Sequence, residues 1–414
     1  MKNNPSTHFG CTRRGFLGGA VAAMAATVIE SERNFATGRD GNTETPKRKL
    51  KLGLVGCGRR GNWIAPLFLK HGGYELYAVA DYFQHVADAQ GEKRGVPKER
   101  RFSGLSGYKK VIESGVDAVA LIVPPCFLAE QSADAVKAGL HVYMAKPVAV
   151  DVPGCLTVEA AGKMAAKKRQ VMLVDYQLPT DPANIRIAQL IRDGGLGKIA
   201  KLITVGINGG RPDPVWLDTI ENRLEKGTWN NTISIGGDFV VSYDIHAIDA
   251  AVWLLGERPI SAMGFSRICR PNPNGDSHDA SSIIFEYADG IIHEHSGLSL
   301  PTGMHDELSC SIHGQTGHGV LNYMDKARFQ PRGMKAVVLD VADLYKAGAV
   351  RNIGAFYDNV TNEKYDAPTV RRAVDGCLTC ILGRESAMRR SRLTMDELVE
   401  ENKRYETNLS GLRD

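Results

Sequence analysis

The sequence predicts an α/β protein of two domains: a doubly wound parallel sheet, followed by an α+β domain with an open-faced, largely antiparallel sheet. Apolar strands alternate with amphipathic helices from residue 49 to about residue 150, the order that a parallel sheet with crossover helices requires. Strand-like segments then follow one another without helices between them, at 200–208, 260–270, 281–287, 290–298 and 308–314. We assign residues 49–150 to the first domain and residues 151–414 to the second, whose C-terminal helices can pack back on the first.

The composition is that of an ordinary globular chain. Of the 414 residues, 43% are hydrophobic and 24% are charged, and the formal net charge is only +4. This length suggests two or three domains. The sequence contains no block of Lys and Arg like those of nucleic-acid-binding tails. We therefore expect no nucleic-acid partner.

The cysteines and histidines do not form a recognisable metal motif. Eight cysteines are widely spaced, and one CxxC pair, Cys377 and Cys380, falls in a run with a helical pattern. A zinc site would need a second such pair or two histidines at ligand spacing. His293 and His295 alternate on a predicted strand, so a structural metal is conceivable, but no further ligand lies at a suitable spacing. We predict no metal and expect buried thiols.

Residues 1–30 have the pattern of an export signal. Arg13 and Arg14 precede Phe16 and Leu17, and a short Ala/Gly-rich run follows that is too short for a comfortable membrane span. The stretch resembles a twin-arginine (Tat) signal, the alternative being a basic disordered tail. Residues 31–48 are polar and are predicted to be a linker. The resemblance implies a periplasmic or otherwise exported protein, folded before export with its cofactor tightly bound, and with no membrane span in its mature form.

A glycine motif follows the first predicted strand. Gly56-x-Gly58-x-x-Gly61 lies between an apolar strand and an amphipathic helix, which is the context that a dinucleotide-binding turn needs. The first glycine permits the tight turn, the second lets the backbone approach a pyrophosphate, and the third lets helix and strand pack closely. The helix N-terminus then offers N–H groups to phosphates. The predicted cofactor contacts of this segment are Gly56, Cys57, Gly58, Arg59, Arg60 and Gly61.

The second strand ends at Asp81, twenty residues beyond Gly61. A carboxylate at that place can accept hydrogen bonds from both adenosine ribose hydroxyls and would repel a 2′-phosphate, so NAD is preferred to NADP. Tyr82 is either an adenine contact or an ordinary surface aromatic. The next strands end at Val123-Pro124 and Lys146-Pro147, and doubly wound sheets bind ligands at such carboxyl ends. Val123, Pro124, Lys146 and Pro147 complete the predicted cofactor site of this Rossmann domain.

From Lys49 to the C-terminus the chain resembles the Gfo/Idh/MocA family, the group of glucose–fructose oxidoreductase and inositol dehydrogenase. The resemblance is carried by the glycine motif with Asp81, by Lys146-Pro147, and by the passages "DPANIRIAQLIRDGGLGKI" and "GGDFVVSYDIHAIDAAVWLLG". It implies chemistry at a sugar or polyol carbinol, and a substrate domain whose open sheet often makes oligomer contacts. We therefore expect a carbohydrate or polyol substrate and a homo-oligomer.

The resemblance also suggests catalytic residues. Lys146 matches the catalytic lysine of the family and His246 matches its proton-transfer histidine. Oxidation of a secondary alcohol needs a base for the hydroxyl proton and a cation or donor near the oxygen. The alternatives are a solvated surface lysine, and a core histidine satisfied by Asp249 and Trp253.

The chain departs from the family pattern at two positions. Ala145 stands where a glutamate usually precedes Lys-Pro, and Ser242 stands where dehydrogenases carry an aspartate four residues before the histidine. Asp244 is a possible replacement, and Tyr243 is a second candidate donor. In the loop "GGRPDPVW", Arg211, Asp213 and Trp216 suit contacts with a sugar, or else simply line a loop between domains.

Three functions remain open on the sequence. The first is NAD-dependent oxidation of a sugar, polyol or glycoside. The second is an NAD-dependent glycoside hydrolase, which oxidises a sugar carbon transiently, eliminates the aglycone and returns the hydride. The third is a ligand sensor, which would keep the glycine turn without needing Lys146 and His246 in one cleft.

Overall fold

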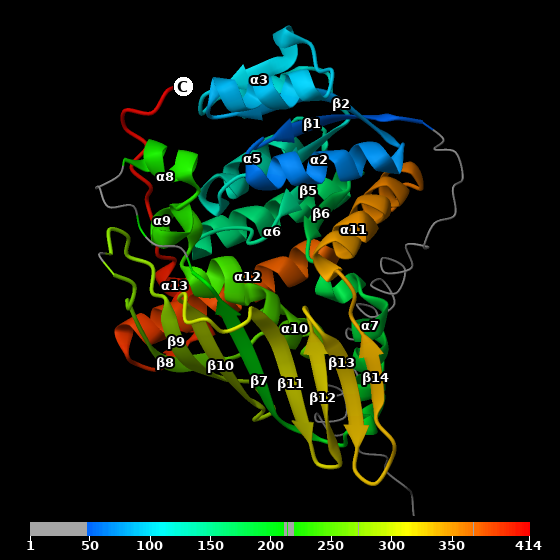
Figure 1. Cartoon of the computed structure of the whole chain (residues 1–414), viewed down its shortest axis with the longest axis vertical. Helices are drawn as coiled ribbons and strands as arrows, with labels where there is room; N and C mark the ends of the chain where they lie inside the picture. Colours follow the sequence, from blue (N-terminus) through cyan, green and yellow to red (C-terminus); the bar gives the residue numbers. More distant parts are fainter. Residues whose placement is uncertain (1–47, 211–212, 214–218, 272, 367) are drawn as a thin grey trace, which may run out of the picture.

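The computed structural model describes residues 48–210, 213, 219–271, 273–366 and 368–414 (Figure 1). The predicted signal, the linker up to residue 47, Arg211 and Trp216 lie outside the described residues. Among the residues described, no helix is long and apolar enough to span a bilayer.

The first sheet is parallel and has the strand order β3-β2-β1-β4-β5-β6 within the described chain. This is the order of a Rossmann sheet, as predicted. Central strands such as β4 are buried throughout because helices cover both faces. The strands are β1 Leu50–Val55, β2 Tyr74–Asp81, β3 Arg101–Ser103, β4 Ala118–Leu121, β5 His141–Ala145 and β6 Met172–Asp175; the connecting helices are α2 Arg59–His71, α3 Gln84–Lys93, α4 Gly107–Glu113, α5 Pro125–Lys137 and α6 Val152–Lys167.

The parallel sheet extends past the boundary that the sequence suggested at residue 150. Strand β6 pairs with β5 and follows α6, an ordinary crossover helix. It was missed because its four residues are too short to show a period. The loop expected before α4 likewise contains β3, three half-buried residues at the sheet edge. The first domain therefore ends near residue 176.

The second sheet is mixed but largely antiparallel. Its order, among the described residues, is β14-β13-β12-β11-β7-β10-β9-β8-β15, and β7 and β10 are its parallel pair. The sequence indicated the five strands β7 to β11 and missed the short ones at its two edges. The bounds are β7 Ile199–Asn208, β8 Ser261–Arg267, β9 Ala280–Glu286, β10 Ile292–Ser299, β11 Glu307–Gly314, β12 Gly317–Asn322, β13 Lys326–Pro331, β14 Val337–Asp340 and β15 Leu393–Thr394.

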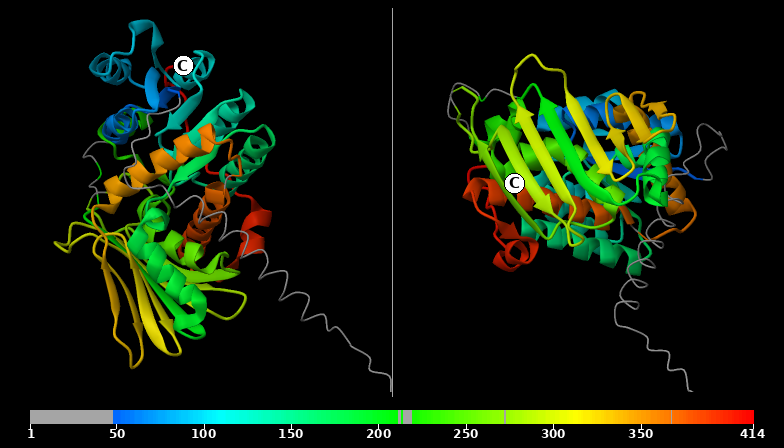
Figure 2. Two further views of the ribbon diagram at one scale, coloured as in Figure 1. Left: turned by 90° about the vertical axis from the view of Figure 1, so that its right-hand side faces the viewer. Right: turned by 90° about the horizontal axis from the view of Figure 1, so that it is seen from below.

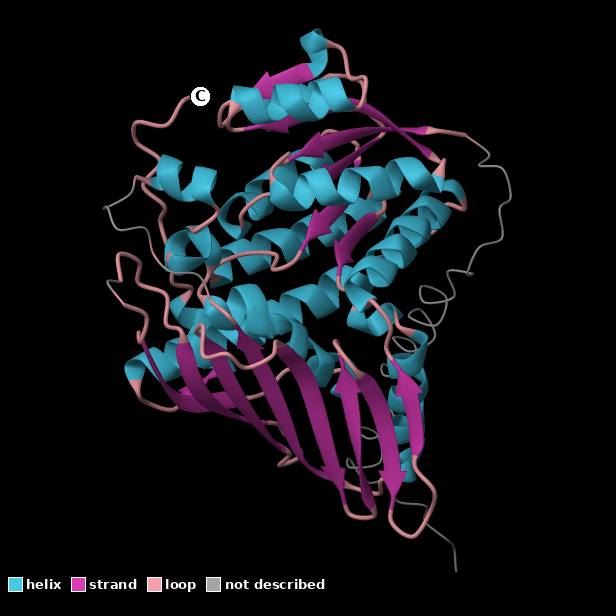
Figure 3. Cartoon of the chain, in the orientation of Figure 1, coloured by secondary structure: helices cyan, strands magenta, loops and turns pink. Residues whose placement is uncertain are grey.

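Helices cover one face of this sheet, and no helix of the described residues covers the other (Figures 2 and 3). Helices α10 and α12 pack on the inner face, and α12 also packs against α6 and β6 of the first domain. Helix α11 packs against α2, so the C-terminal part of the chain returns to the first domain. The helices of this half are α7 Pro182–Leu190, α8 Ile220–Lys226, α9 Ile233–Gly236, α10 Ile245–Leu255, α11 Leu344–Thr361, α12 Pro368–Arg389 and α13 Met395–Glu401, with short 3₁₀ turns η1 Lys98–Arg100, η2 Leu178–Thr180 and η4 Trp229–Asn231 and π turns η3 Ile191–Gly195 and η5 Val240–Asp244.

Candidate active site

The three glycines of the motif have three different surroundings. Gly56 has φ +89°, and a Cβ there would lie 2.2 Å from the carbonyl oxygen of Ile122. A Cβ on Gly61 would lie 1.9 Å from the carbonyl oxygen of Gly56. A Cβ on Gly58, by contrast, would meet nothing within 4 Å. The turn thus needs Gly56 and Gly61 for its own packing, whereas Gly58 leaves open space at the N-terminus of α2, as a pyrophosphate requires.

Asp81 ties this turn to the end of β2. One carboxylate oxygen accepts the backbone N–H of Cys57 (2.8 Å), and the other accepts that of Phe83 (3.1 Å). Burial raises the pKa of Asp81, and the two backbone bonds oppose that rise. The side chain of Cys57 is buried, so this residue offers its backbone to the site. Arg59 is exposed at the start of α2.

Tyr82 holds a distant part of the chain. Its hydroxyl donates to Glu221 of α8 (2.9 Å) and accepts the backbone N–H of Arg413 (3.1 Å). The Arg413 guanidinium lies 5.3 Å from the ring centroid. The predicted contact between Tyr82 and the adenine stays a prediction, but the residue also anchors the C-terminal segment beside β2.

Val123, Pro124 and Lys146-Pro147 follow β4 and β5, so they lie at the carboxyl edge of the sheet with the glycine turn. A Cβ on Gly56 would come within 3.0 Å of the Val123 side chain. Pro124 caps α5. The predicted cofactor residues of the described chain thus share one edge, and they fit a dinucleotide.

Lys146 is half-buried and points into the second domain. Its Nζ donates to the carbonyl oxygen of Ser242 at 2.6 Å. Burial, and then the positive charge of Arg60, lower the pKa of Lys146 to about 7. A solvated surface lysine would show neither feature, so that alternative is wrong.

Arg60 contacts more than the glycine turn, and its charge reaches Lys146. Its Nη2 bonds Asp175 at the end of β6 (2.7 Å), and its guanidinium lies 4.4 Å from the ring centroids of both Trp63 and Tyr345. The other Asp175 oxygen accepts Asn352 Nδ2 at 2.8 Å. Sequence reasoning missed Asp175, although its place after an apolar run was a signal of the same kind as Asp81.

His246 lies near the N-terminus of α10 and is 9% exposed. Its ring centroid is 4.9 Å from that of Tyr323 and 6.5 Å from that of Tyr176. Burial, together with the charges of Lys146 and Arg60, lowers its pKa well below the usual value, so the imidazole is neutral. No described residue hydrogen-bonds to this ring. A core histidine satisfied by neighbours would have such partners, so the surroundings favour a functional histidine.

The side chains of Tyr243 and Asp244 hydrogen-bond to strands of the second sheet. The Tyr243 hydroxyl donates to the carbonyl of Ile207 on β7 (3.2 Å), and burial raises its pKa. Asp244 is 1% exposed and bonds His295 on β10. The carboxylate that the sequence offered as a possible replacement for an aspartate at Ser242 is thus engaged by His295, and its catalytic role stays a prediction. Two residues along a helical turn point in different directions.

Asp213 was predicted to contact substrate, and the structure contradicts this. Its carboxylate is fully buried and accepts bonds from Arg270 Nε (2.8 Å), Arg223 Nη1 (3.3 Å) and Asn231 Nδ2 (2.7 Å). Burial alone would raise its pKa, but these bonds, led by those of Arg270 and Asn231, lower it to about 2. Asp213 holds a loop together. Its predicted companions Arg211 and Trp216 lie outside the described residues.

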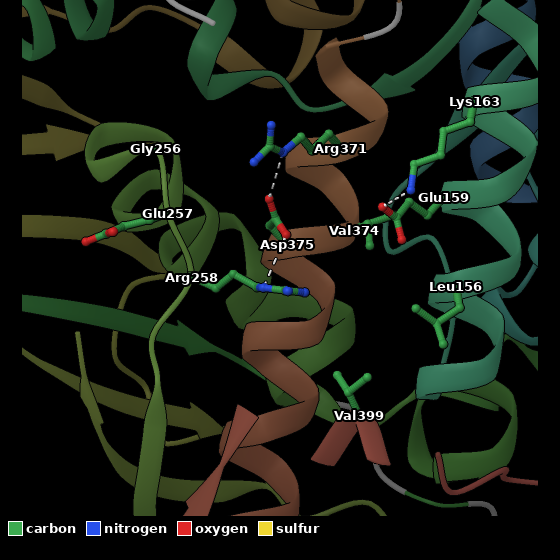
Figure 4. Close-up of a pocket in the computed structure, with 10 residues that line it drawn as sticks. All are labelled: Leu156, Glu159, Lys163, Gly256, Glu257, Arg258, Arg371, Val374, Asp375 and Val399. Atoms are coloured by element: carbon green, nitrogen blue, oxygen red, sulfur yellow. Dashed lines mark hydrogen bonds and ion pairs between the residues drawn. The ribbon is translucent and has the colours of Figure 1, made fainter. Parts of the chain in front are cut away.

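A groove of about 610 Å³ lies elsewhere, between α6, α12 and the turn after α10 (Figure 4). Five of its six charged residues pair with one another: Arg258 and Arg371 with Asp375, at 3.6 and 3.9 Å, and Lys163 with Glu159; the sixth is Glu257. None of the predicted site residues lines it. In the described chain, no cluster of three or more His, Cys, Asp or Glu side chains is suited to hold a metal, and the Cys377 and Cys380 thiols are buried in α12.

Two sequence models of one family match this chain in the order of its domains. Residues 50–176 match the oxidoreductase family with an NAD-binding Rossmann fold, and residues 185–319 match the Gfo/Idh/MocA C-terminal domain. Together the matches cover more than half of the chain. The chain belongs to the Gfo/Idh/MocA family. Its Rossmann domain binds NAD, as the glycine turn and Asp81 predicted.

Curated relatives are distant. Inositol 2-dehydrogenase of Rhizobium meliloti is 24% identical over 243 residues, 58% of this chain and 66% of that protein. An α-N-acetylgalactosaminidase of Shewanella oneidensis is 24% identical over 208 residues, 45% of this chain and 44% of that protein. The first of these alignments spans just under two thirds of the relative.

Solved structures share the fold across nearly all the described chain. An inositol dehydrogenase homologue of Azotobacter vinelandii in complex with NAD⁺ is 18% identical, with a TM-score of 0.73 over 86% of this chain and 100% of the other. A levoglucosan dehydrogenase in complex with NADH and levoglucosan is 18% identical, with a TM-score of 0.70 over 84% of this chain and 100% of the other.

Proposed function

We propose that this member of the family oxidises a secondary hydroxyl of a sugar, polyol or glycoside with NAD. The observation that carries the proposal is the placement of Lys146 at the turn that leads into α10. Its Nζ donates to the carbonyl of Ser242, four residues before His246, and its positive charge helps to lower the pKa of His246. The two groups come from different domains, and neither is needed to hold a ligand that is merely sensed.

The protonation states of the two residues suit their roles. His246 is neutral because burial and two nearby cations disfavour its charged form, so its ring can accept the hydroxyl proton. Lys146, with a pKa near 7, supplies an ammonium that stabilises the developing alkoxide oxygen. NAD, when bound, supplies the hydride acceptor. Arg60 and Asp175 form an ion pair whose charges act on Lys146 in opposite directions, Arg60 lowering its pKa and Asp175 raising it.

A glycoside hydrolase cycle is the second candidate. The similarity to an α-N-acetylgalactosaminidase supports it, as do Ala145 and Ser242, which replace two carboxylates typical of the dehydrogenases. Lys146 and His246 could serve the oxidation step of either cycle. The two functions differ in their net products.

One experiment separates them. Purified protein is incubated with a panel of free sugars, polyols and aryl glycosides while NADH and released aglycone are followed together. Stoichiometric NADH with no aglycone supports the oxidoreductase, whereas aglycone release without net NADH supports the hydrolase. If no compound in the panel gives either product although NAD binds, the sensor is favoured.

We further propose that the protein is exported through the Tat pathway and works as a homo-oligomer. The twin arginines of the first 30 residues support export. The bare outer face of the second sheet supports self-association, because it exposes large apolar side chains such as Met263, Phe265 and Ile284.

A further inference from the structure

A chain of polar side chains is buried under the inner face of the second sheet. His295 Nε2 lies 3.0 Å from Asp244 Oδ2, and His295 Nδ1 lies 3.0 Å from Thr204 Oγ1. The same hydroxyl lies 2.7 Å from His293 Nε2. All four side chains are at most 1% exposed. Nothing in the fold alone requires such a chain, because apolar residues fill the equivalent positions of the neighbouring strands.

Two glycines make room for the carboxylate. Gly206 on β7 and Gly297 on β10 are paired across the parallel strands. A Cβ on either would lie 2.3 Å from an oxygen of Asp244. Burying a carboxylate costs several kcal/mol unless it is paired and hydrogen-bonded, so the niche and its histidine indicate a purpose beyond packing.

The same turn also holds Lys146. The carbonyl of Ser242 that accepts Lys146 Nζ belongs to the π turn Val240–Asp244, of which Asp244 is the last residue. Such π turns inside helices often occur at functional sites. The second Asp244 oxygen, Oδ1, has no hydrogen-bond partner among the described residues. His295 therefore fixes the last residue of a turn, and the carbonyl of Ser242 in the middle of that turn accepts a hydrogen bond from Lys146.

We propose that Asp244, held by His295 and Thr204, is a positioning residue for Lys146: it fixes the turn that carries the Ser242 carbonyl and sets a negative charge beside the ammonium. The proposal rests on the proposed function only in that Lys146 takes part in turnover. This role explains why a buried aspartate stands two residues before His246 and yet bonds to the second sheet.

The charges around Lys146 and Asp244 determine in which direction the pKa of Lys146 should move when the Asp244 charge is removed. Lys146 faces Arg60 of α2, Asp175 of β6, Cys380 of α12 and Asp244; burial and Arg60 lower its pKa, and the other three raise it. Burial raises the pKa of Asp244, and the hydrogen bond and charge of His295, followed by the charge of Lys146, oppose that rise. The Asp244 charge also acts on Asp238, Tyr243 and Cys380. Removing the Asp244 charge should therefore lower the pKa of Lys146 further.

The test is the pH profile of kcat for Asp244→Asn, a change of charge at nearly constant volume. Because turnover needs the Lys146 ammonium, kcat falls on the alkaline side as Lys146 loses its proton. We expect Asp244→Asn to move this alkaline limb to lower pH by about one unit, with KM for NAD unchanged. Thr204→Val keeps the charge but loosens His295, so we expect kcat to fall about threefold, on the scale of one weakened hydrogen bond, with the limb nearly in place.

The matched control is Ser281→Ala, because the Ser281 hydroxyl borders the same niche beside Gly297 but makes no bond within the chain of four. Its profile should equal that of the wild type. The proposal is overturned if the alkaline limb and kcat are unchanged in both Asp244→Asn and Thr204→Val. It is also overturned if Asp244→Asn loses thermal stability while its alkaline limb stays where it is in the wild type. If Asp244→Asn does not fold, Thr204→Val alone decides. Full turnover in Lys146→Met would instead refute the proposed function. The experiment therefore distinguishes failure of the proposed function from failure of the positioning role of Asp244.

Discussion

At Lys146 two sets of neighbours oppose each other. Burial and Arg60 destabilise the ammonium, while Cys380, Asp175 and Asp244 stabilise it, and the balance brings its pKa to about 7. A group of this kind is half-protonated near neutral pH, where it can donate to a developing oxyanion and release the proton again. His246 lies in the same field of positive charge, and burial together with the charges of Lys146 and Arg60 lowers its pKa and keeps the imidazole neutral.

We predict that Lys146→Met and His246→Asn each lower kcat by about 10²–10⁴-fold with little effect on the Kd of NAD, because each residue acts mainly in the transition state. Steady-state kinetics on the substrate found by the panel, with calorimetric NAD titration, measure both quantities. Lys163→Met is the matched control, since Lys163 is an exposed lysine paired with Glu159 on α6. Near-wild-type turnover of both variants would disprove the catalytic roles of Lys146 and His246. If His246→Asn does not fold, His246 is instead a structural residue of the core.

Asp81 allows a second prediction at this scale. The protein should bind NAD more tightly than NADP, because the carboxylate would repel a 2′-phosphate. Asp81→Ala should bring the Kd values for NAD and NADP closer together. The substitution also removes the hydrogen bonds to the Cys57 and Phe83 amides, so binding of both cofactors should weaken. Titration calorimetry of the wild type and the variant measures the ratio. Equal affinities of the wild type for both cofactors would contradict the prediction.

At the scale of elements, the glycines in the turn between β1 and α2 meet two different requirements. One is the packing of helix against strand, and the other is room for a ligand. Gly61 is needed by the protein itself, because a side chain would strike the backbone of Gly56. Gly58 is needed only by a ligand, because a side chain there would point into open space.

We therefore predict opposite results for two similar substitutions. Gly61→Ala should lower Tm, at a cost of about 1–3 kcal/mol typical of overpacking, because helix and strand must move apart. Gly58→Ala should leave Tm unchanged or slightly raised and weaken NAD binding at least tenfold by crowding the pyrophosphate. Thermal melts without NAD, and NAD titrations of both variants, test this. A Gly58→Ala protein with wild-type NAD affinity would show that the cofactor does not approach this turn.

The elements that could be predicted are those whose signal is local. The strand–glycine–helix motif, the apolar strand before Lys146 and the strands from β7 to β11 each show their pattern within a short window. Strands β3 and β6 are too short for a period, and β14 and β15 are exposed or two residues long. The roles of Asp213 and Asp244 could not be predicted, because their partners Arg270 and His295 lie about 50 residues or more away and meet them only after folding.

At the scale of the whole molecule, the C-terminal helices join the two domains. Helix α12 lies between the second sheet and α6, and α11 packs on α2 (Figure 1). Helix α12 also contacts α10, so it connects the helix that carries His246 with the first domain, where Lys146 follows β5. Such a protein is suited to an export route that carries folded cargo.

We predict that export depends on Arg13 and Arg14. Replacing both with lysine keeps the charge but removes the guanidinium pair that the Tat resemblance singles out, so full-length protein should stay in the cytoplasm. Fractionation of cells and immunoblotting measure its distribution. A lysine substitution at Arg48, beyond the signal, is the control. Unchanged periplasmic yield of the double variant would support the alternative of a basic tail.

The outer face of the second sheet leads to the last prediction. Met263 and Phe265 on β8, Ile284 on β9 and Ile292 on β10 point away from the helices and are 46%, 58%, 52% and 48% exposed. Met263 and Ile284 are direct cross-strand partners, so these two apolar side chains lie next to each other on this face. No helix covers this face in Figure 2. Apolar side chains gathered on one bare face are typical of a surface that a second copy of the chain covers.

Phe265→Glu should therefore shift the protein towards the monomer, because a carboxylate would be buried without a partner in the assembled interface. Light scattering coupled to size-exclusion chromatography measures the mass over a range of concentrations. Met334→Glu is the matched control: Met334 is 69% exposed in the connection between β13 and β14, away from the patch. Loss of the oligomer in Phe265→Glu alone places the interface on β8 to β10. A wild type that is monomeric at all concentrations, or an oligomer that survives Phe265→Glu, would contradict this use of the sheet.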